Sequence, residues 1–406
     1  MPNKIKSAAT YLPHRLNSVV NLLLRDEAIS GKILLAAALL ALIVVNSPLL
    51  NIYESFWHTN LSIGLGEFSL SEDLRHWMND GLMVIFFLVV GLEIKREMVK
   101  GELRNPKKAI LPIAAAVGGM IVPVLIYLVF NFGSETARGW GIPVATDIAF
   151  AIGVLALIGS RVPSSLKVFL LTLAIVDDLL AILIIAIFYT AQINQAALAA
   201  AFAIIAMLLV SRKLWPNSIV PYVVLGACLW AALHKSGIHP TIAGALVGFL
   251  APLKAGDLPS IAERLETAMI PISTFVVIPL FAFANSGVVF SGISFTSEIN
   301  PILAGTIFGL VLGKPLGVLA VAFLLTKFNI ATLPKGVTWG HMLGVGLLAG
   351  IGFTVSIFIT ELAFVSNQQY ISAAKVGIII ASVLAAVAGA LTLILQRKKT
   401  SPELSP

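Results

Sequence analysis

Two adjacent acids stand in the middle of an apolar stretch: Asp177 and Asp178, in Leu-Ala-Ile-Val-Asp-Asp-Leu-Leu-Ala. A charge at the centre of a membrane-spanning helix costs about 2.5–3.5 kcal/mol on insertion scales, so acids placed there are functional candidates. Two carboxylates in a site of low dielectric cannot both stay ionised cheaply, which favours holding a proton. Carboxylate oxygens also suit a hard cation such as Na+. The pair predicts a site where protons and a cation compete; the alternative is a structural pair with buried partners.

Lys314 lies at the centre of another apolar stretch, 302–325, too far from either end to extend its ammonium into water. A lysine in that position needs an acidic partner or a depressed pKa. Glycines recur around it at every fourth position, which permits close approach of another helix: Gly305, Gly309, Gly313 and Gly317. The stripe alone indicates packing, and the lysine within it indicates a functional site.

Two apolar stretches contain residues that interrupt a helix. In the first, Gly141 and Pro143 precede Thr146 and Asp147, which are good N-cap residues for a helix that resumes. The second contains Gly-Ile-Gly-Phe-Thr at 350–354. Helix ends at mid-membrane need compensating charges, and Asp147 suits the positive end while Lys314 suits the negative one. Paired interruptions point to a transporter's binding site; the alternative is two glycine-rich packing faces.

Other titratable residues lie nearer the ends of apolar stretches. Glu93 and Glu97 share one helix face, and with Glu266 they form a candidate proton-sensing cluster, with a solvated helix end as the simpler interpretation. His239 carries a group that changes charge near neutral pH, although a local hydrogen bond is the commoner role. Asp80 and Glu361 are interpreted as interfacial acids.

The elements that position these residues must cross a membrane. A chain of 406 residues with 58% hydrophobic and 12% charged residues, and a mean hydropathy of +0.97, is not a soluble globule. Runs that can cross about 30 Å of hydrocarbon predict twelve helical spans. They lie near 33–46, 78–95, 109–131, 142–158, 166–190, 196–210, 218–233, 238–252, 269–290, 302–325, 338–360 and 371–396.

The loops between the spans give an independent test of this topology, because Lys and Arg collect on the cytoplasmic side. With the N-terminus and every second loop inside, 22 of the 27 basic residues fall on that side. The opposite loops hold Arg75, Arg138 and Lys235. Both termini are therefore expected in the cytoplasm, and the net charge of +7 reflects topology rather than nucleic-acid binding.

The predicted organisation is simple. Residues 1–32 form a cytoplasmic segment without a cleavage site for a signal peptide, 33–396 form one transmembrane transporter domain, and 397–406 form a cytoplasmic tail. Alternating apolar residues and a turn signal at Gly64-Leu-Gly66 predict a small outer β-hairpin near 59–70. The segment 253–268 is expected to be a polar cytoplasmic connection.

Six ordered strings, spread over most of the chain, resemble the NhaA family of sodium/proton antiporters. They are Gly91-Leu-Glu-Ile-Lys-Arg-Glu97, Ala145-Thr-Asp-Ile-Ala-Phe150, Ala174-Ile-Val-Asp-Asp-Leu179, Leu280-Phe-Ala-Phe-Ala-Asn285, Leu312-Gly-Lys-Pro-Leu316 and Gly350-Ile-Gly-Phe-Thr354. NhaA is a standard example of transporters built from inverted repeats.

The resemblance implies an all-α polytopic fold of about twelve helices, with inverted repeats in about 109–190 and 302–396 and two discontinuous helices, 142–158 and 338–360, that cross near the cation site. It implies that Asp178 binds the transported Na+ with Asp177, that Asp177 binds a proton and pairs with Lys314, and that Asp147 and Thr146 assist. It further implies regulation by pH through Glu93, Glu97, Glu266 and His239, and a homodimer formed through the outer hairpin.

The expected function is an electrogenic Na+(Li+)/H+ antiporter of the bacterial inner membrane that exports sodium by alternating access under pH regulation. It is a secondary transporter, not an enzyme, and needs no cofactor, only lipid and the transported ions. A sodium-coupled solute symporter of similar fold is the main alternative. An intramembrane aspartyl protease would need its two acids on separate helices, and a channel is disfavoured because a paired ionisable site binds ions too strongly for fast conduction.

Overall fold

The computed structural model describes residues 27–65, 68–190, 193–215, 217–253, 259–289, 300–365 and 367–396. The expected tail and most of the expected N-terminal segment lie outside these residues. The chain divides into two compact units, which are described separately. The first comprises Met1–Ala41, Asn51–Val99 and Ala186–Ala284; the second comprises Leu42–Leu50, Lys100–Ile185 and Asn285–Pro406.

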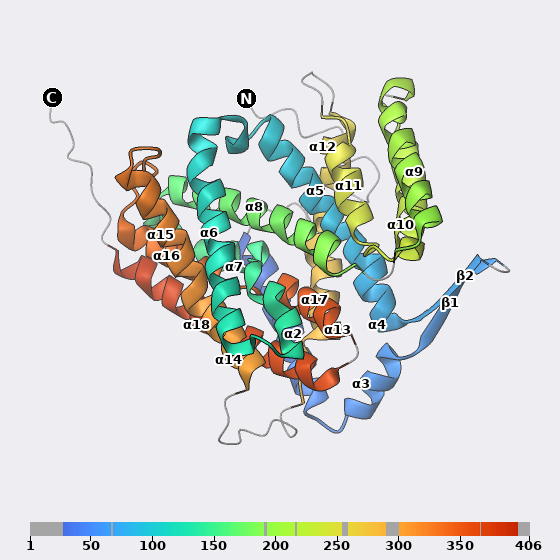
Figure 1. Cartoon of the computed structure of the whole chain (residues 1–406), viewed down its shortest axis with the longest axis horizontal. Coiled ribbons are helices and arrows are strands. Elements are labelled where there is room, and N and C mark those ends of the chain that lie inside the picture. Colours follow the sequence, from blue (N-terminus) through green and yellow to red (C-terminus); the bar gives the residue numbers. More distant parts are fainter. Residues whose placement is uncertain are drawn as a thin grey trace. The chain divides into compact units, whose positions relative to one another are not determined.

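The first unit consists of helices and one hairpin (Figure 1). Its elements, with η marking 3-10 or π turns, are most of α2 (Glu27–Val45) and α3 (Leu50–Trp57), β1 (Asn60–Leu65), β2 (Phe68–Asp73), α4 (Leu74–His76), η1 (Trp77–Leu82), α5 (Met83–Val99), α9 (Gln195–Leu214), α10 (Val220–Ser236), α11 (Ile242–Leu250), α12 (Ile261–Ile272), η5 (Ser273–Val277) and α13 (Ile278–Asn285).

Glycines bring α5 and α11 into backbone contact (Figure 1). A Cβ atom on Gly244 would lie 2.1 Å from the carbonyl oxygen of Val84, and one on Gly91 would lie 2.3 Å from that of Ala245. No side chain fits at such distances, so only glycine permits this approach.

The expected outer hairpin is confirmed. β1 and β2 are antiparallel, with Asn60 opposite Asp73 and Leu65 opposite Phe68. Gly64 and Leu65 still belong to β1, so the turn falls later than the expected Gly64–Gly66 signal. Figure 1 shows the hairpin extending away from α3 and α4. Trp77 Nε1 donates to the carbonyl of Leu61 at 2.9 Å, which fixes the base of the hairpin to η1.

The second unit is entirely helical over its described residues. Its elements are η2 (Glu102–Arg104), α6 (Pro106–Asn131), η3 (Glu135–Val144), α7 (Ile148–Ile158), η4 (Gly159–Arg161), nearly all of α8 (Ser164–Phe188), α14 (Pro301–Phe308), η7 (Gly309–Gly313), α15 (Lys314–Lys327), α16 (Trp339–Ala349), α17 (Phe353–Ala363) and α18 (Gln368–Leu395).

The expected glycine stripe lies where α14, η7 and α15, one continuous helical run, pack against α6. A Cβ atom on Gly317 would lie 2.1 Å from the carbonyl oxygen of Gly118. η7 is a π turn in which the amide of Lys314 donates to the carbonyl of Gly309, five residues back. The π turn therefore ends at the lysine that the sequence singles out.

In two places of this unit, two consecutive helices are separated by a short break and the helix axis bends there. η3 and α7 meet at 41°, and α16 and α17 meet at 43°. The first break covers 145–147, after the proline and glycines of η3, and the second covers 350–352. A Cβ atom on Gly350 would lie 2.4 Å from the carbonyl of Leu310, so this break packs tightly against η7.

By length and apolar composition, six described helices can cross a membrane, or up to nine if each bent pair counts as one span. α5, α10 and α11 are not among them, because they have 17, 17 and 9 residues, short of the roughly 20 that a span needs. Large apolar side chains lie exposed on the outer faces of the long helices, among them Val129 and Ile187. Such faces suit lipid.

One boundary differs from the sequence expectation. α12 begins at Ile261, inside the stretch expected to be a polar connection. Ser260 and Glu263 form a capping box, in which each side chain bonds to the backbone of the other residue, and this box starts the helix early.

Candidate functional site

The site lies in the second unit, where the two breaks meet. The amide of Asp147 donates to the carbonyl of Ile351 at 2.6 Å. Thr146 Oγ1 donates to the carbonyl of Ala349, the last residue of α16, at 2.8 Å. These bonds supply partners for backbone groups that a continuous helix would have satisfied internally.

Asp147 compensates two positive helix ends at once. As the N-cap of α7 it accepts from the amide of Phe150 at 2.9 Å through Oδ1. Its Oδ2 accepts from the amide of Thr354, in the first turn of α17, at 3.1 Å and from Thr354 Oγ1 at 2.7 Å. The expectation that Asp147 compensates the positive end of a resumed helix is confirmed for α7. The bond to Thr354 shows that it also compensates the positive end of α17. With 2% exposure, this carboxylate is held by fixed donors rather than by water.

Lys314 meets both an acid and a negative helix end. Its Nζ lies 2.5 Å from Asp177 Oδ2 and donates to the carbonyl of Val144, the last residue of η3, at 2.5 Å. Asp177 Oδ2 also lies 2.6 Å from Thr146 Oγ1, whose single hydrogen is shared between this carboxylate and the carbonyl of Ala349. Both charged side chains are completely buried. The expectation that Lys314 needs an acidic partner is confirmed, and the partner is Asp177.

Asp178 follows Asp177 on α8 and is 4% exposed. Neighbouring positions on a helix differ by about 100°, so the two carboxylates point to different parts of the same interior. Asp177 is engaged by Lys314 and Thr146. The structure thus brings together all five residues that the sequence places at a cation and proton site: Thr146, Asp147, Asp177, Asp178 and Lys314.

This arrangement allows a proton and a cation to compete for the same carboxylates. A hard cation requires oxygen ligands, and the carboxylates of Asp177 and Asp178 and the hydroxyl of Thr146 can supply them. A cation that takes Asp177 as a ligand must compete with the ammonium of Lys314. A proton on Asp177 likewise weakens that ion pair, so proton binding, cation binding and the ion pair are mutually dependent.

The four residues expected to regulate the protein belong to the first unit. Arg96 Nη1 forms a hydrogen bond and ion pair with Glu266 Oε1. Glu93 lies within electrostatic range of Arg96, Glu266 and Glu97. These three glutamates and one arginine therefore form one cluster at the end of α5, and His239 lies elsewhere in the unit.

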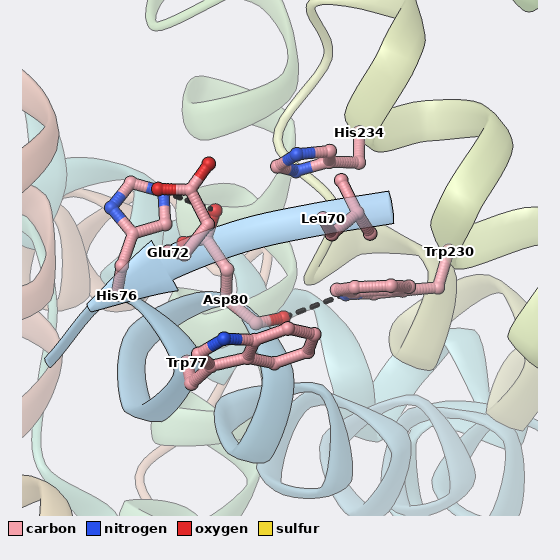
Figure 2. Close-up of a pocket in the computed structure, with 7 residues that line it drawn as sticks. All are labelled: Leu70, Glu72, His76, Trp77, Asp80, Trp230 and His234. Carbon is pink, nitrogen blue, oxygen red and sulfur yellow. Dashed lines mark hydrogen bonds and ion pairs between the residues drawn. The ribbon is translucent and has the colours of Figure 1, made fainter. Parts of the chain in front are cut away.

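His239 instead faces Asp80, near the start of the same long helix. Its Nε2 lies 3.2 Å from Asp80 Oδ1, and His76 Nε2 lies 3.2 Å from Asp80 Oδ2. Figure 2 shows Asp80 and His76 beside the stacked rings of Trp77 and Trp230, and Trp230 Nε1 donates to the carbonyl of Asp80 at 2.7 Å. The hydrogen bond between the His76 ring and Asp80 raises the pKa of His76 to about 9. Asp80 is therefore not a solvated interfacial acid but a buried, doubly paired one.

Sequence reasoning missed Thr354 and the role of Asp80. Thr354 stands two residues after Gly352, in a break that mirrors the Thr-Asp of the first, and that symmetry was the available signal. Asp80 stands one turn after His76, which was the signal for a pair. Glu361, also expected to be interfacial, pairs with the buried Lys375 at 2.6 Å.

Comparisons with known proteins show which family and which fold this chain resembles. The family model described as Na+/H+ antiporter 1 matches residues 21–393. Proteins described as Na(+)/H(+) antiporter NhaA from Shewanella loihica and Pelagibacter ubique are each 47% identical, over 90% and 92% of this chain and 94% and 96% of their own. The solved sodium proton antiporter MjNhaP1 from Methanocaldococcus jannaschii at pH 8 has a TM-score of 0.52 at 13% identity, covering 94% of this chain and 98% of that one, which shows likeness of fold alone.

Proposed function

The chain belongs to the Na+/H+ antiporter 1 family and is a multi-pass membrane sodium/proton antiporter, and from that premise we propose how its own residues exchange the two ions. Asp178 binds the transported Na+ or Li+, and the Asp177–Lys314 pair exchanges a proton as Asp177 alternates between Lys314 and the cation. The observation that carries this proposal is the buried Lys314–Asp177 pair beside Asp178.

In the proposed cycle, a cation from the cytoplasm displaces the proton held by Asp178, and Asp177 leaves Lys314 to complete the oxygen ligands. The ammonium of Lys314, now without its counter-ion, releases a second proton. Rearrangement of the protein then exposes the site to the outside, where one proton returns to Asp178 and one to the amine of Lys314, the cation leaves, and the ion pair forms again. More than one proton enters for each cation, so positive charge moves inwards. Each unbalanced charge gains about 2.3 kcal/mol per 100 mV, which drives export against a sodium gradient.

The membrane arrangement is also a proposal. Twelve spans with inverted repeats in about 109–190 and 302–396 fit the two bent pairs, whose bends of 41° and 43° are nearly equal and whose breaks bond to each other. The basic residues of alternate loops favour a bacterial inner membrane with both termini in the cytoplasm.

Regulation by pH is proposed for the cluster of Glu93, Glu97 and Glu266, together with His239. The carboxylate of Glu93 interacts electrostatically with those of Glu97 and Glu266, so the proposed sensor acts as one coupled group. His239 contributes through its pair with Asp80.

The experiment is reconstitution into liposomes with an imposed pH gradient, with luminal pH followed by a dye as Na+, Li+ or K+ is added. Wild-type protein should move protons on addition of Na+ or Li+ and not of K+. Asp178→Asn should abolish this movement, whereas the matched change Glu135→Gln, at an exposed position of the same unit, should preserve it. Full activity in Asp178→Asn, with folded protein, would remove Asp178 from the ion path.

A further inference from the structure

A cavity of about 640 Å³ lies in the second unit, apart from the cation site. Three chain segments meet around it: the first turns of α6 with η2, the first turns of α8, and the connection that leads to α16. The topology drawn from the basic residues assigns all three loops to the cytoplasmic side. The cavity therefore opens where these helices enter the inner leaflet.

The cavity carries more positive than negative charge. Lys107, Lys108 and Lys335 line it, against the single carboxylate of Glu102. Lys108 Nζ lies 3.4 Å from Glu102 Oε2. Within the described part of the chain, no carboxylate lies at ion-pair distance from Lys107 or Lys335. Two ammonium groups of one cavity thus lack a counter-ion among the described residues.

The remaining lining is amphipathic. Ser164 and Ser165 contribute hydroxyls near the lysines, and Ser165 Oγ donates to the carbonyl of Lys335 at 2.7 Å. This bond ties α8 to the connection that carries Lys335, so the lysine's backbone is held at the cavity. Val168 also lines the cavity and has 43% of its surface exposed, so apolar surface adjoins the charged groups.

We propose that this cavity binds the phosphate headgroup of an anionic phospholipid, with Lys107 and Lys335 as its counter-ions. Lysine is a common phosphate binder, and basic pockets between membrane helices on the cytoplasmic side suit lipid headgroups. A soluble phosphate compound shares the charged chemistry but leaves the exposed side chain of Val168 without an apolar partner. The phosphate of a lipid neutralises the lysines, and its acyl chains cover the apolar surface.

The test uses the purified full-length chain in neutral detergent, with bound lipid counted by native mass spectrometry. The protein is titrated with phosphatidylglycerol or phosphatidylcholine of identical acyl chains. Phosphatidylglycerol should bind more tightly, and Lys107→Gln/Lys335→Gln should weaken its binding about 30-fold, because each lysine near an anionic lipid contributes about a 5-fold factor. The control Lys213→Gln/Lys327→Gln, with the same charge change on the same side, should remain within about 2-fold of wild type.

Equal binding of the two lipids, or unchanged binding in the double variant, would overturn the proposal. Displacement of phosphatidylglycerol by glycerol 3-phosphate at equal concentration would overturn it too, in favour of a soluble phosphate ligand. Thermal unfolding of each variant shows whether it is folded. Since binding is read without transport, failure here leaves the antiport mechanism untouched, and failure of antiport leaves the lipid site untouched.

Discussion

Asp177 and Lys314 hold opposite charges at positions that water does not reach. A buried ion pair adds little net stability over apolar residues, but removing one partner leaves the other charge uncompensated. In the proposed mechanism the pair serves transport, because an ion pair that water does not reach responds strongly to an arriving proton or cation. The pair Lys375–Glu361 differs, since the Glu361 side chain is 20% exposed and can reach water.

Lys314→Met should lower stability by about 3–5 kcal/mol at neutral pH, because Asp177 is then buried without its cation. Thermal unfolding in detergent measures this loss. The double variant Asp177→Asn/Lys314→Met should recover most of it while remaining inactive in transport. Lys375→Met is the matched comparison and should cost less; an equal loss in both single variants would contradict this explanation.

The His76–Asp80 pair predicts a pH-dependent contribution to stability. Its pKa of about 9 in the folded protein lies above the ordinary value of 6.5, so the contribution is complete below about pH 6.5 and is lost as pH rises through about 9. Glu72, Asp73 and His239 also act on this pair. The difference in thermal midpoint between wild type and His76→Gln should shrink from pH 6 to pH 10.

A double-mutant cycle provides the control for that measurement. In an Asp80→Asn background, His76→Gln should change the thermal midpoint little at any pH, because the partner that binds the imidazolium is gone. A persistent pH-dependent difference in that background would assign the effect to Glu72 or Asp73 instead.

Helix contacts in both units depend on glycines that leave no room for a methyl group. Gly244→Ala should strongly destabilise the first unit, because the new Cβ would lie 2.1 Å from the backbone oxygen of Val84. Gly226→Ala is the matched control on the adjacent α10, where the Cβ would meet Val247 Cγ2 at 3.3 Å, a methyl group that can move. Thermal midpoints of the two variants test this, and similar losses would contradict the backbone-contact explanation.

Element starts fixed by local contacts could be predicted from the sequence. Asp147 begins α7 because a cap needs only a side chain and an amide three residues later. The same reasoning, applied to Ser260 and Glu263, would have placed the start of α12 correctly, so that miss was avoidable.

Contacts between distant segments could not be predicted from the residues alone. Spacing indicates that Lys314 needs an acid, but the choice of Asp177 depends on how α15 packs against α6 and on the π turn before the lysine. The bond from Thr354 to Asp147 likewise exists only because the two breaks cross. The pairing of Lys314 with Asp177 was predicted only from the resemblance to a family. The bond from Thr354 to Asp147 was not predicted.

At the scale of the whole molecule, we propose a homodimer that forms through the outer hairpin. Leu61 and Ile63 lie on one face of β1 with 42% and 53% of their surface exposed, although the hairpin extends away from its own helices. Exposed apolar residues of this kind favour contact with another chain. The hairpin of a second copy is a suitable partner, because edge strands pair readily.

Leu61→Ser/Ile63→Ser should therefore shift the protein from dimer to monomer, as measured by light scattering in detergent. Ser62→Ala is the matched control, because Ser62 points to the opposite face and pairs with Ser71 across the hairpin. Transport by each monomer should persist, since every residue of the cation site belongs to one chain. An unchanged mass for the double variant would place the dimer contact elsewhere.

The π turn before Lys314 has a consequence for the history of the family. A π turn holds one more residue than the α-helical turn it would replace. Deleting one residue of 309–313 would restore α geometry and rotate everything upstream by about 100° relative to the lysine. Among descendants of a common ancestor, a one-residue gap at this place in an alignment would therefore mark lineages in which the ammonium lost its aspartate.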